Sequence, residues 1–521
     1  MRRQRLPIGI QHFRRLRELR CYYADKTPLI LQLIDQGDHY FLSRPRRFGK
    51  SLLIDTLREL FEGNEPLFRG LDIHGRWDWS VRHPAVRLSF DGNYNKPGNL
   101  HSNVISQLAM IEQDAGLDPA QSPRTGPDRL QNLLHRLHRA TGQPVVVLVD
   151  EYDKPILDVL DDPEMAKANR DYLRGFYGII KGSAEHVRFV FVTGVSMFSK
   201  VSLFSGLNNL EDISLDPRYA ALCGYTDRDL DTVFAPELPG LDRDEMRRWY
   251  NGYRWRGEEK LYNPFDVLLL FRNREFRPWW FETGSPTFLF RMMMDRGVSP
   301  MELQNLTADA VQLSKFDVDA IGTEALLFQT GYLTITNESW DGVDTLYTLD
   351  YPNFEVRRSL NHGLLGYLGQ QGTQVSDHGK ALGRLLADND FDGFAERLKA
   401  FFAGVPYQWH GSGGLARYEA WYAGMLYACF QTIGLDLRVE DSSSHGRADM
   451  VVCHAGQVFV LEFKMAPDEG DEESALRSAM SQMRERGYAE QYRNRGEPIH
   501  LVGLAFGRTK RSLLGLRAEK A

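Results

Sequence analysis

The chain has 521 residues, of which 42% are hydrophobic, and its formal net charge at pH 7 is -7. That length is too great for one hydrophobic core, so we expect about three domains. The acidic balance excludes a protein that binds nucleic acid through its overall charge, and DNA contacts would have to come from local basic patches. No apolar run approaches the roughly 18 residues of a membrane-spanning helix, so we expect no membrane segment.

The N-terminal segment is basic, with many arginines between Arg2 and Arg20, but it lacks the apolar stretch of a signal peptide. These arginines are either a patch that contacts DNA or the solvated face of an amphipathic helix. The absence of CxxC spacing predicts a cytoplasmic protein without a zinc site, since the cysteines are isolated: Cys21, Cys223, Cys429 and Cys453.

A phosphate-binding loop is predicted close to the N-terminus. The strand candidate His39–Leu42 runs into a loop that ends in Gly-Lys-Ser, and a helix is expected over Leu52–Phe61. This is the layout of a P-loop, in which loop amides and the helix N-terminus hold phosphates. Lys50 would reach the β- and γ-phosphates of ATP, and Ser51 would hold Mg²⁺. The loop residues predicted to bind ATP are Arg46, Arg47, Gly49, Lys50 and Ser51.

The loop alone is a weak signal, because Arg44 stands where the first glycine is usual and Gly-Lys-Ser is frequent by chance. The apolar run Pro144–Val149 supplies a partner, as expected for a central parallel strand that ends in two acids. Asp150 would bind the Mg²⁺ shell and Glu151 would orient the attacking water. The alternative is a buried strand that leaves the core through a charged turn. A further strand, Arg188–Val192, would place Thr193 beside the γ-phosphate.

Four stretches in this half resemble an AAA-ATPase-like family of bacteria: YYADKT, SRPRRFGKS, VDEYDKP and FVTGVSMFSKVSLFSGLNNLEDIS. In that family an arginine at the position of Arg44 is normal. The resemblance implies a P-loop NTPase domain with a parallel sheet over residues 1–225, and ATP as its ligand.

Residues 226–375 have the weakest sequence signals for structure or function. Tyr225–Trp255 has helical character and would form a lid beyond the ATPase core. A helix, a turn at Gly331, a hairpin and a helix over Phe354–Tyr367 then follow. This order is compatible with a winged-helix module that binds DNA, and equally with a compact helical packing unit. Gln371–Asp377 is the expected linker into residues 376–521.

A hairpin near the C-terminus carries two opposed acids. Gly446–Cys453 and Gln457–Lys464 read as strands joined by a tight turn. If Cys453 pairs with Val458, Asp449 lies opposite Glu462, and Lys464 falls on the same face as Glu462. Two carboxylates and a lysine at the end of a buried strand predict a Mg²⁺ or Mn²⁺ site, with a cation beside the water it activates. The alternative is a salt bridge that caps a surface hairpin.

Two predicted helices flank this hairpin. Glu419 shares an apolar helical stripe upstream, where a carboxylate is costly to bury unless something pairs with it. Downstream, a helix over Glu473–Tyr492 carries Gln482 and Tyr488. The order of Glu419, Asp449, Glu462-x-Lys464 and Gln482 resembles the PD-(D/E)XK nuclease superfamily, and it resembles more closely the nuclease domain that ends many AAA-ATPase-like proteins. Ala448 stands in place of the proline of the superfamily name.

The whole chain is therefore predicted to be an α/β protein with a P-loop domain, a mainly helical middle region and a PD-(D/E)XK nuclease domain. Its predicted activity is ATP hydrolysis together with Mg²⁺-dependent DNA cleavage that depends on nucleotide state. Two alternatives stay open, namely a nucleotide-dependent switch or scaffold with an inactive nuclease-like domain, and a non-enzymatic DNA-binding module of a mobile element. The expected partners are ATP and DNA, with a homo-oligomer left open. The resemblance alone suggests a role in defence or in mobile elements.

Overall fold

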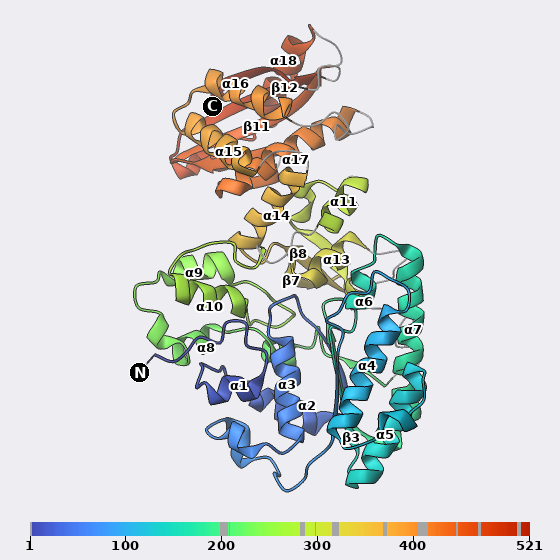
Figure 1. Ribbon diagram of the computed structural model, residues 1–521. Helices are drawn as coiled ribbons and strands as arrows, with labels where there is room; N and C mark the ends of the chain where they lie inside the picture. Colours follow the sequence, from blue (N-terminus) through green and yellow to red (C-terminus); the bar gives the residue numbers. More distant parts are fainter. Residues whose placement is uncertain are drawn as a thin grey trace. The chain divides into compact units, whose positions relative to one another are not determined.

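The computed structural model describes residues 3–197, 207, 209–281, 287–296, 298–314, 322–367, 372–404, 415–443, 446–466, 470–507 and 512–521 (Figure 1). Within these ranges, the side chains of residues 287–288, 372–376, 415–420, 440–443 and 446–447 lie outside the description. The chain packs as two compact units. The first holds Met1–Trp280 and Leu306–Asn353, and the second holds Phe281–Asn305 and Phe354–Ala521. The predicted middle region therefore contributes to both, and its boundaries stay a prediction.

A five-stranded parallel sheet forms the centre of the first unit, as the sequence predicts. The strand order β2-β3-β4-β1-β5 places β4 between the P-loop strand β1 and the strand β3 that ends in Asp150. All six residues of β3 are buried, which agrees with its continuous apolar sequence. The strands are β1 His39–Ser43, β2 Ala85–Ser89, β3 Val145–Asp150, β4 Val187–Gly194 and β5 Glu211–Asp212.

Helices cover both faces of this sheet (Figure 1). The connection from β1 to β2 runs across the sheet in one direction, whereas the connections from β2 to β3 and from β3 to β4 run back in the other. Right-handed crossovers therefore put α3 on one face and α4, α5 and α7 on the opposite face. The helices are α1 Phe13–Glu18, α2 Thr27–Gln36, α3 Lys50–Phe61, α4 Asn99–Asp114, α5 Gly126–Thr141, α6 Lys154–Leu157 and α7 Pro163–Gly182.

Several N-terminal arginines are used inside the first unit. Arg14 pairs with the buried carboxylate of Glu59 at 2.7 Å. Arg17 donates to the main-chain carbonyls of Leu67 and Arg69 at 2.8 and 2.7 Å. Arg14 and Arg17 therefore contact their own unit, a use that neither expectation for the basic segment had included.

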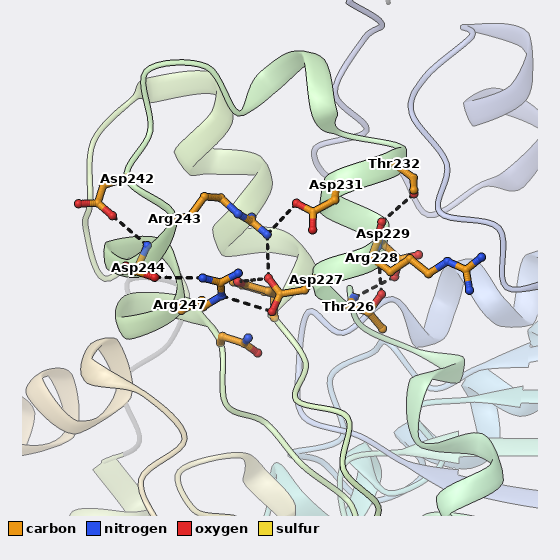
Figure 2. A network of polar contacts seen from close by, with 12 residues as sticks. Thr226, Asp227, Arg228, Asp229, Asp231, Thr232, Asp242, Arg243, Asp244 and Arg247 are labelled. Carbon is orange, nitrogen blue, oxygen red and sulfur yellow. Dashed lines mark hydrogen bonds and ion pairs between the residues drawn. The ribbon is translucent and has the colours of Figure 1, made fainter.

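The lid region consists of short helices, namely α8 Asp227–Thr232, α9 Arg243–Tyr250 and α10 Pro264–Asn273. The expectation of helix throughout Tyr225–Trp255 was wrong, because Pro236 and Pro239 lie in the stretch between α8 and α9. Helix α8 begins with a capping box, in which the side chains of Thr226 and Asp229 each bind the other residue's main-chain amide. Figure 2 shows α8 joined to α9 through Arg243, which contacts Asp227 at 2.7 Å and Asp231 at 3.0 Å.

A second, three-stranded sheet completes the first unit, in the order β6-β8-β7. The predicted turn at Gly331 and the hairpin of β7 and β8 are confirmed, whereas the pairing of β6 with β8 has no clear sequence signal. Binding of DNA by this segment stays a prediction. The elements are β6 Leu306–Asp309, α12 Ala310–Ser314, α13 Thr323–Thr330, β7 Thr334–Trp340 and β8 Thr345–Asp350.

The second unit contains a mixed sheet in the order β13-β12-β11-β10-β9, in which β11 and β12 are parallel and the other pairs antiparallel. The predicted hairpin is confirmed, and its turn consists of Ala455 and Gly456, both with positive φ. Such a two-residue turn matches the twist of the strands that it joins. The strands are β9 Asp436–Ser443, β10 Gly446–His454, β11 Gln457–Ala466, β12 Ile499–Gly507 and β13 Leu513–Lys520.

Helices pack on both faces of the mixed sheet. The ring of Tyr422 on α17 stacks on Phe506 of β12 at 4.2 Å, and the same face carries Phe463. Met480 of α18 lies against Gly503 on the other face, which is the face of Glu462. The helices are α11 Thr287–Asp295, α14 Phe354–Tyr367, α15 Gly372–Ala387, α16 Phe391–Ala403, α17 Leu415–Ile433 and α18 Glu472–Glu485.

Two boundary predictions in this unit were wrong. Residues expected to be a linker, Gln371–Asp377, instead belong from Gly372 onward to α15. The helix expected to continue to Tyr492 ends at Glu485, because Gly487 takes a left-handed φ of 57° and a short 3₁₀ helix follows. The predicted helix over Phe354–Tyr367 has those bounds. None of the helices in the described part of the chain is both long and apolar enough to cross a membrane.

Candidate functional site

The C-terminal hairpin has the register that the sequence predicts. Cys453 pairs with Val458 and Met450 pairs with Leu461, so the next position brings Asp449 opposite Glu462. The alternating face of β11 that carries Phe459, Leu461 and Phe463 is buried, as expected. The two acids therefore lie where the buried strand β11 nears its end, on the face covered by α18.

Glu462 is a fully buried acid of this site. Its side chain is 0% exposed, and Oε1 accepts hydrogen bonds from Lys464 Nζ at 2.9 Å and from the Gln482 amide. Its other oxygen, Oε2, is buried and has no hydrogen-bond partner among the described residues. Burial and then the nearby charge of Asp449 raise the pKa of Glu462 to about 7, and Lys464 opposes this shift. A carboxylate in this state is stabilised by an added positive charge.

Asp449 completes the acid pair. It is half-buried, and its Oδ2 accepts a hydrogen bond from the Phe463 amide at 2.9 Å, which ties the carboxylate to the facing strand. Carboxylate oxygens are the ligands that Mg²⁺ and Mn²⁺ prefer. The unpaired Oε2 of Glu462 beside Asp449 fits such an ion. No group of three or more His, Cys, Asp or Glu side chains within the described residues is placed to hold a metal. The predicted third acid, Glu419, belongs to α17, and its side chain lies outside the description.

Gln482 reaches the site from α18, as predicted. Its Nε2 contacts both Glu462 Oε1 and the hydroxyl of Tyr488 at 3.2 Å. Tyr488, which was expected on the same helix as Gln482, instead follows the turn at Gly487, beyond the end of α18. An ionised carboxylate only accepts hydrogen bonds, so the amide nitrogen of Gln482 is the atom that faces Glu462.

The P-loop in the first unit brings Lys50 to the carboxyl edge of the parallel sheet. Gly49 has a φ of 96° and precedes α3, whose first residue is Lys50. The Lys50 ammonium is buried and donates to the carbonyls of Arg44 and Pro45 at 2.8 and 2.9 Å. Burial lowers the pKa of Lys50, and the charge of Asp150 works against this shift. A buried ammonium at a helix N-terminus is suited to binding phosphate.

The two acids predicted to follow the central strand lie near Lys50. Asp150 is buried, and its Oδ1 has no hydrogen-bond partner among the described residues; the same holds for Glu151 Oε2. Burial and then the charge of Asp150 raise the pKa of Glu151. Glu151 also has a φ of 54°, a conformation that side chains adopt rarely and that clusters at functional sites. These acids suit a divalent cation and a bound water.

The other residues predicted to bind ATP have varied surroundings. Thr193 Oγ1 donates to the Leu42 carbonyl at 2.8 Å, so its hydroxyl bridges two strands. Arg46 and Arg47 are exposed, and the guanidinium of Arg47 lies 4.9 Å from the centre of the Phe265 ring. Ser51 is half-buried in the first turn of α3.

Asp153 is a residue of this edge whose role the sequence did not suggest. It is buried, and its Oδ2 accepts from the Val195 and Ser196 amides at 3.0 and 2.5 Å and from the Ser196 hydroxyl. It therefore fixes the segment that follows β4. The sequence signal that could have revealed this role is that Asp153 is the third acid within Asp150–Asp153.

Two regions of the chain match known protein families. A family described as predicted AAA-ATPase matches residues 7–204, and the PD-(D/E)XK nuclease superfamily matches residues 417–514. A protein of Azotobacter chroococcum mcd 1, described as an uncharacterized protein in the vnfD 5′ region, is 53% identical over 521 residues. That match covers 100% of this chain and 99% of the relative. No solved structure matches. The chain belongs to the family that joins a predicted AAA-ATPase domain to a C-terminal domain of the PD-(D/E)XK nuclease superfamily.

Proposed function

We propose that this protein binds and hydrolyses ATP, that its C-terminal domain cleaves DNA with the help of Mg²⁺ or Mn²⁺, and that nucleotide state controls the cleavage. The observation that carries the proposal is the buried Glu462 carboxylate, whose Oε2 has no hydrogen-bond partner in the described part of the chain and whose neighbour is a second acid. A surface salt bridge would not need this burial, so the arrangement favours a metal site.

Each residue of the C-terminal site has a proposed role. Asp449 and Glu462 would hold the ion, which when bound supplies positive charge at the scissile phosphate and lowers the pKa of water. Lys464 lies at the rim of the site, where its ammonium would stabilise the charge that develops on the phosphate. Gln482 orients Glu462 through Oε1 and leaves Oε2 for the ion. Glu419 is proposed as a further acid from α17.

The N-terminal site is proposed to hold ATP with Mg²⁺. Lys50 would bind the β- and γ-phosphates, and the exposed Arg46 and Arg47 would lie near them. Asp150 and Ser51 would hold the ion, and Glu151 would orient the attacking water. The unpaired oxygens of Asp150 and Glu151 support this assignment, because buried acids without partners are costly unless a cation or water meets them.

The test is cleavage of supercoiled plasmid DNA by the full chain with Mg²⁺ or Mn²⁺, in three states: with ATP, with ADP and without nucleotide. We expect cleavage that requires the ion, at rates that differ between the states by about fivefold or more, the usual size of coupling between two sites. Equal rates in all three states would leave two independent enzymes on one chain. No cleavage in any state, with DNA binding retained, would favour the alternative below.

The alternative is a nucleotide-dependent switch or scaffold that binds DNA without cutting it. One observation favours it, since Lys464 and Gln482 already satisfy Oε1 of Glu462 without an ion. In that case the acid, the lysine and the amide form a structural cluster. The two proposals differ in the effect of Mg²⁺, which stabilises the C-terminal domain only if the acids bind it.

A further inference from the structure

The P-loop, residues 44–49, packs against aromatic side chains that follow helix α9. The guanidinium of Arg44 is fully buried and lies 4.2 Å from the centre of the Trp255 ring. The ring of Phe48 meets Tyr253 and Trp255 edge-on, at 4.8 and 5.1 Å. Arg44 and Phe48, near the two ends of the loop, therefore both contact Trp255.

Residues Gly252–Trp255, which we call the relay segment, are also fastened to strand β7. The Arg254 amide donates to the Thr334 hydroxyl at 2.7 Å, and that hydroxyl donates to the Arg254 carbonyl at 3.1 Å. The guanidinium of Arg254 donates to the Thr336 carbonyl at 2.9 Å. The relay segment thus touches the P-loop with its aromatic side chains and the three-stranded sheet with its backbone.

Gly252 fixes the start of the relay segment. Its φ is 119°, and a Cβ placed on it would lie 1.9 Å from the carbonyl oxygen of Pro352. No other residue fits this close approach to the main chain. Helix α9, which ends just before the segment, is held to α8 by the ion pairs of Figure 2. The segment therefore runs from a braced helix to the residues that follow β8.

A second connection leads from the acid side of the nucleotide site to the same sheet. Asp153 binds the amides of Val195 and Ser196, and the next amide, that of Met197, donates to Gln329 Oε1 at 2.7 Å. Gln329 lies on α13, is 2% exposed, and donates in turn to the Leu313 carbonyl at 2.6 Å. Because both ends of this buried amide are hydrogen-bonded, it fixes the position of Met197 relative to Leu313.

The three-stranded sheet lies where the chain passes between its two compact units. The crossings fall after Trp280, before Leu306 and after Asn353. Leu306 begins β6, Asn353 follows β8 closely, and the Trp280 ring packs at 5.2 Å on Tyr332, just before β7. We call β6, β7, β8 and α13 the hub, because each crossing adjoins one of them.

We propose that the hub conveys nucleotide occupancy to the C-terminal unit. In this proposal the relay segment moves when the P-loop binds phosphate. Gln329 responds to changes in the segment after β4 that Asp153 binds. Phosphate would compete for the Lys50 donors that now bind the Arg44 and Pro45 carbonyls, and these two residues belong to the loop that holds the relay segment. A ligand shifts a conformational equilibrium only through such differences in contact. The inference rests on the proposed nucleotide control and names its route.

The experiment is hydrogen exchange, followed by mass spectrometry, over residues 345–360 of the full chain, with and without a non-hydrolysable ATP analogue. The variants are Trp255→Leu, which removes the ring beneath Arg44, and Gln329→Leu, which removes both amide bonds. The control is Trp249→Phe, because Trp249 is 7% exposed against 4% for Trp255 and packs on Phe276, outside the relay segment. Trp255→Phe, which keeps a ring, tests rescue. Binding of the analogue is measured for each variant.

In the wild type and in Trp249→Phe, we expect the analogue to change exchange over residues 345–360. In Trp255→Leu and Gln329→Leu, that change is lost while the affinity for the analogue stays within about tenfold of wild type, a difference of about 1.4 kcal/mol. Trp255→Phe recovers part of the change. The hub route is overturned if both leucine variants bind the analogue and respond like wild type. If Trp255→Leu does not fold, Gln329→Leu and Trp255→Phe decide alone.

This design separates the two proposals. If the wild type binds the analogue but exchange over residues 345–360 does not change, the hub route fails, whereas nucleotide control of cleavage is still tested on plasmid DNA. If the wild type shows no binding at all, the proposed ATP site fails first, and the hub route falls with it.

Discussion

The proposed nucleotide site and the C-terminal acid pair both place a lysine near carboxylates, but the lysine has different hydrogen-bond partners in the two sites. In the first site Lys50 donates to two main-chain carbonyls, and the acids Asp150 and Glu151 each keep an oxygen without a hydrogen-bond partner among the described residues. In the second site Lys464 bonds directly to Glu462, and only the other oxygen of that acid lacks a partner there.

This difference agrees with the ligand that we propose for each site. A lysine held apart from its acids leaves room for an anion at the lysine and a cation at the acids, which is the charge pattern of a nucleotide with Mg²⁺. A lysine already paired with its acid leaves a demand for a cation alone, shared by Asp449 and Glu462. Under the proposed function, the bound cation would then attract the DNA phosphate.

The largest effect that tests this comparison is loss of DNA cleavage. Asp449→Ala removes a proposed ion ligand, and Lys464→Ala removes a charge that would act on the transition state. We expect each to reduce cleavage by about 10²-fold or more, the effect of losing one preorganised group. ATP hydrolysis should stay close to wild type, because the two sites belong to different compact units. Asp436→Ala, at an exposed acid of β9, is the control.

The metal-site proposal is wrong if Asp449→Ala still cuts plasmid DNA at the wild-type rate. It is also wrong if Lys464→Ala and Asp436→Ala reduce cleavage equally, since a general loss of stability would then explain both.

The second effect concerns ATP. Lys50→Ala should weaken ATP binding by about tenfold or more, because it removes a charged donor to the phosphates. Glu151→Gln should bind ATP but hydrolyse it about 10²-fold more slowly, since only the group that orients the water is lost. Binding is measured by calorimetry and hydrolysis by phosphate release, with the exposed Lys181→Ala on α7 as control. Wild-type hydrolysis in both variants would contradict the proposed site.

The sequence predicted the strands of both sites but not the contacts of single polar side chains. The strands β1, β3, β10 and β11 follow from continuous or alternating apolar runs, and the register of the hairpin follows from its two-residue turn. The pattern could not show that α18 ends before Tyr488, because one glycine with positive φ decides this. It also could not show that Gln329 meets Met197, since this contact joins residues 132 positions apart. Long-range contacts of single polar side chains leave no periodic signal.

The third effect is the pH dependence of stability. Because burial raises the pKa of Glu462 from 4.5 to about 7, the folded protein holds a proton in this window that the unfolded chain has lost. The free energy of unfolding therefore falls as the pH rises through the window and is not regained above it. In the absence of metal, Glu462→Gln should recover about 1–3 kcal/mol at pH 8 relative to pH 4.5. Urea unfolding with EDTA measures this.

The same urea unfolding measurement with added Mg²⁺ tests whether the acid pair binds the ion. At pH 8 it should stabilise the wild type and leave Glu462→Gln nearly unchanged, because only the ionised acid pair attracts the ion. Glu485→Gln, at an exposed residue of the same helix α18, should behave like wild type. A wild type whose stability is flat between pH 4.5 and 7 would contradict the raised pKa of Glu462.

The smallest effect concerns Thr193. A substitution there tests whether this residue supports the sheet or contacts the nucleotide. Its hydroxyl donates to the Leu42 carbonyl, so Thr193→Val leaves a buried carbonyl without that donor and should cost about 1 kcal/mol of stability. Because the hydroxyl is already engaged, we expect ATP hydrolysis to fall less in Thr193→Val than in Glu151→Gln. Thermal unfolding and phosphate release measure the two quantities in one preparation. A variant with unchanged stability but hydrolysis as slow as Glu151→Gln would instead make Thr193 a group that touches the γ-phosphate.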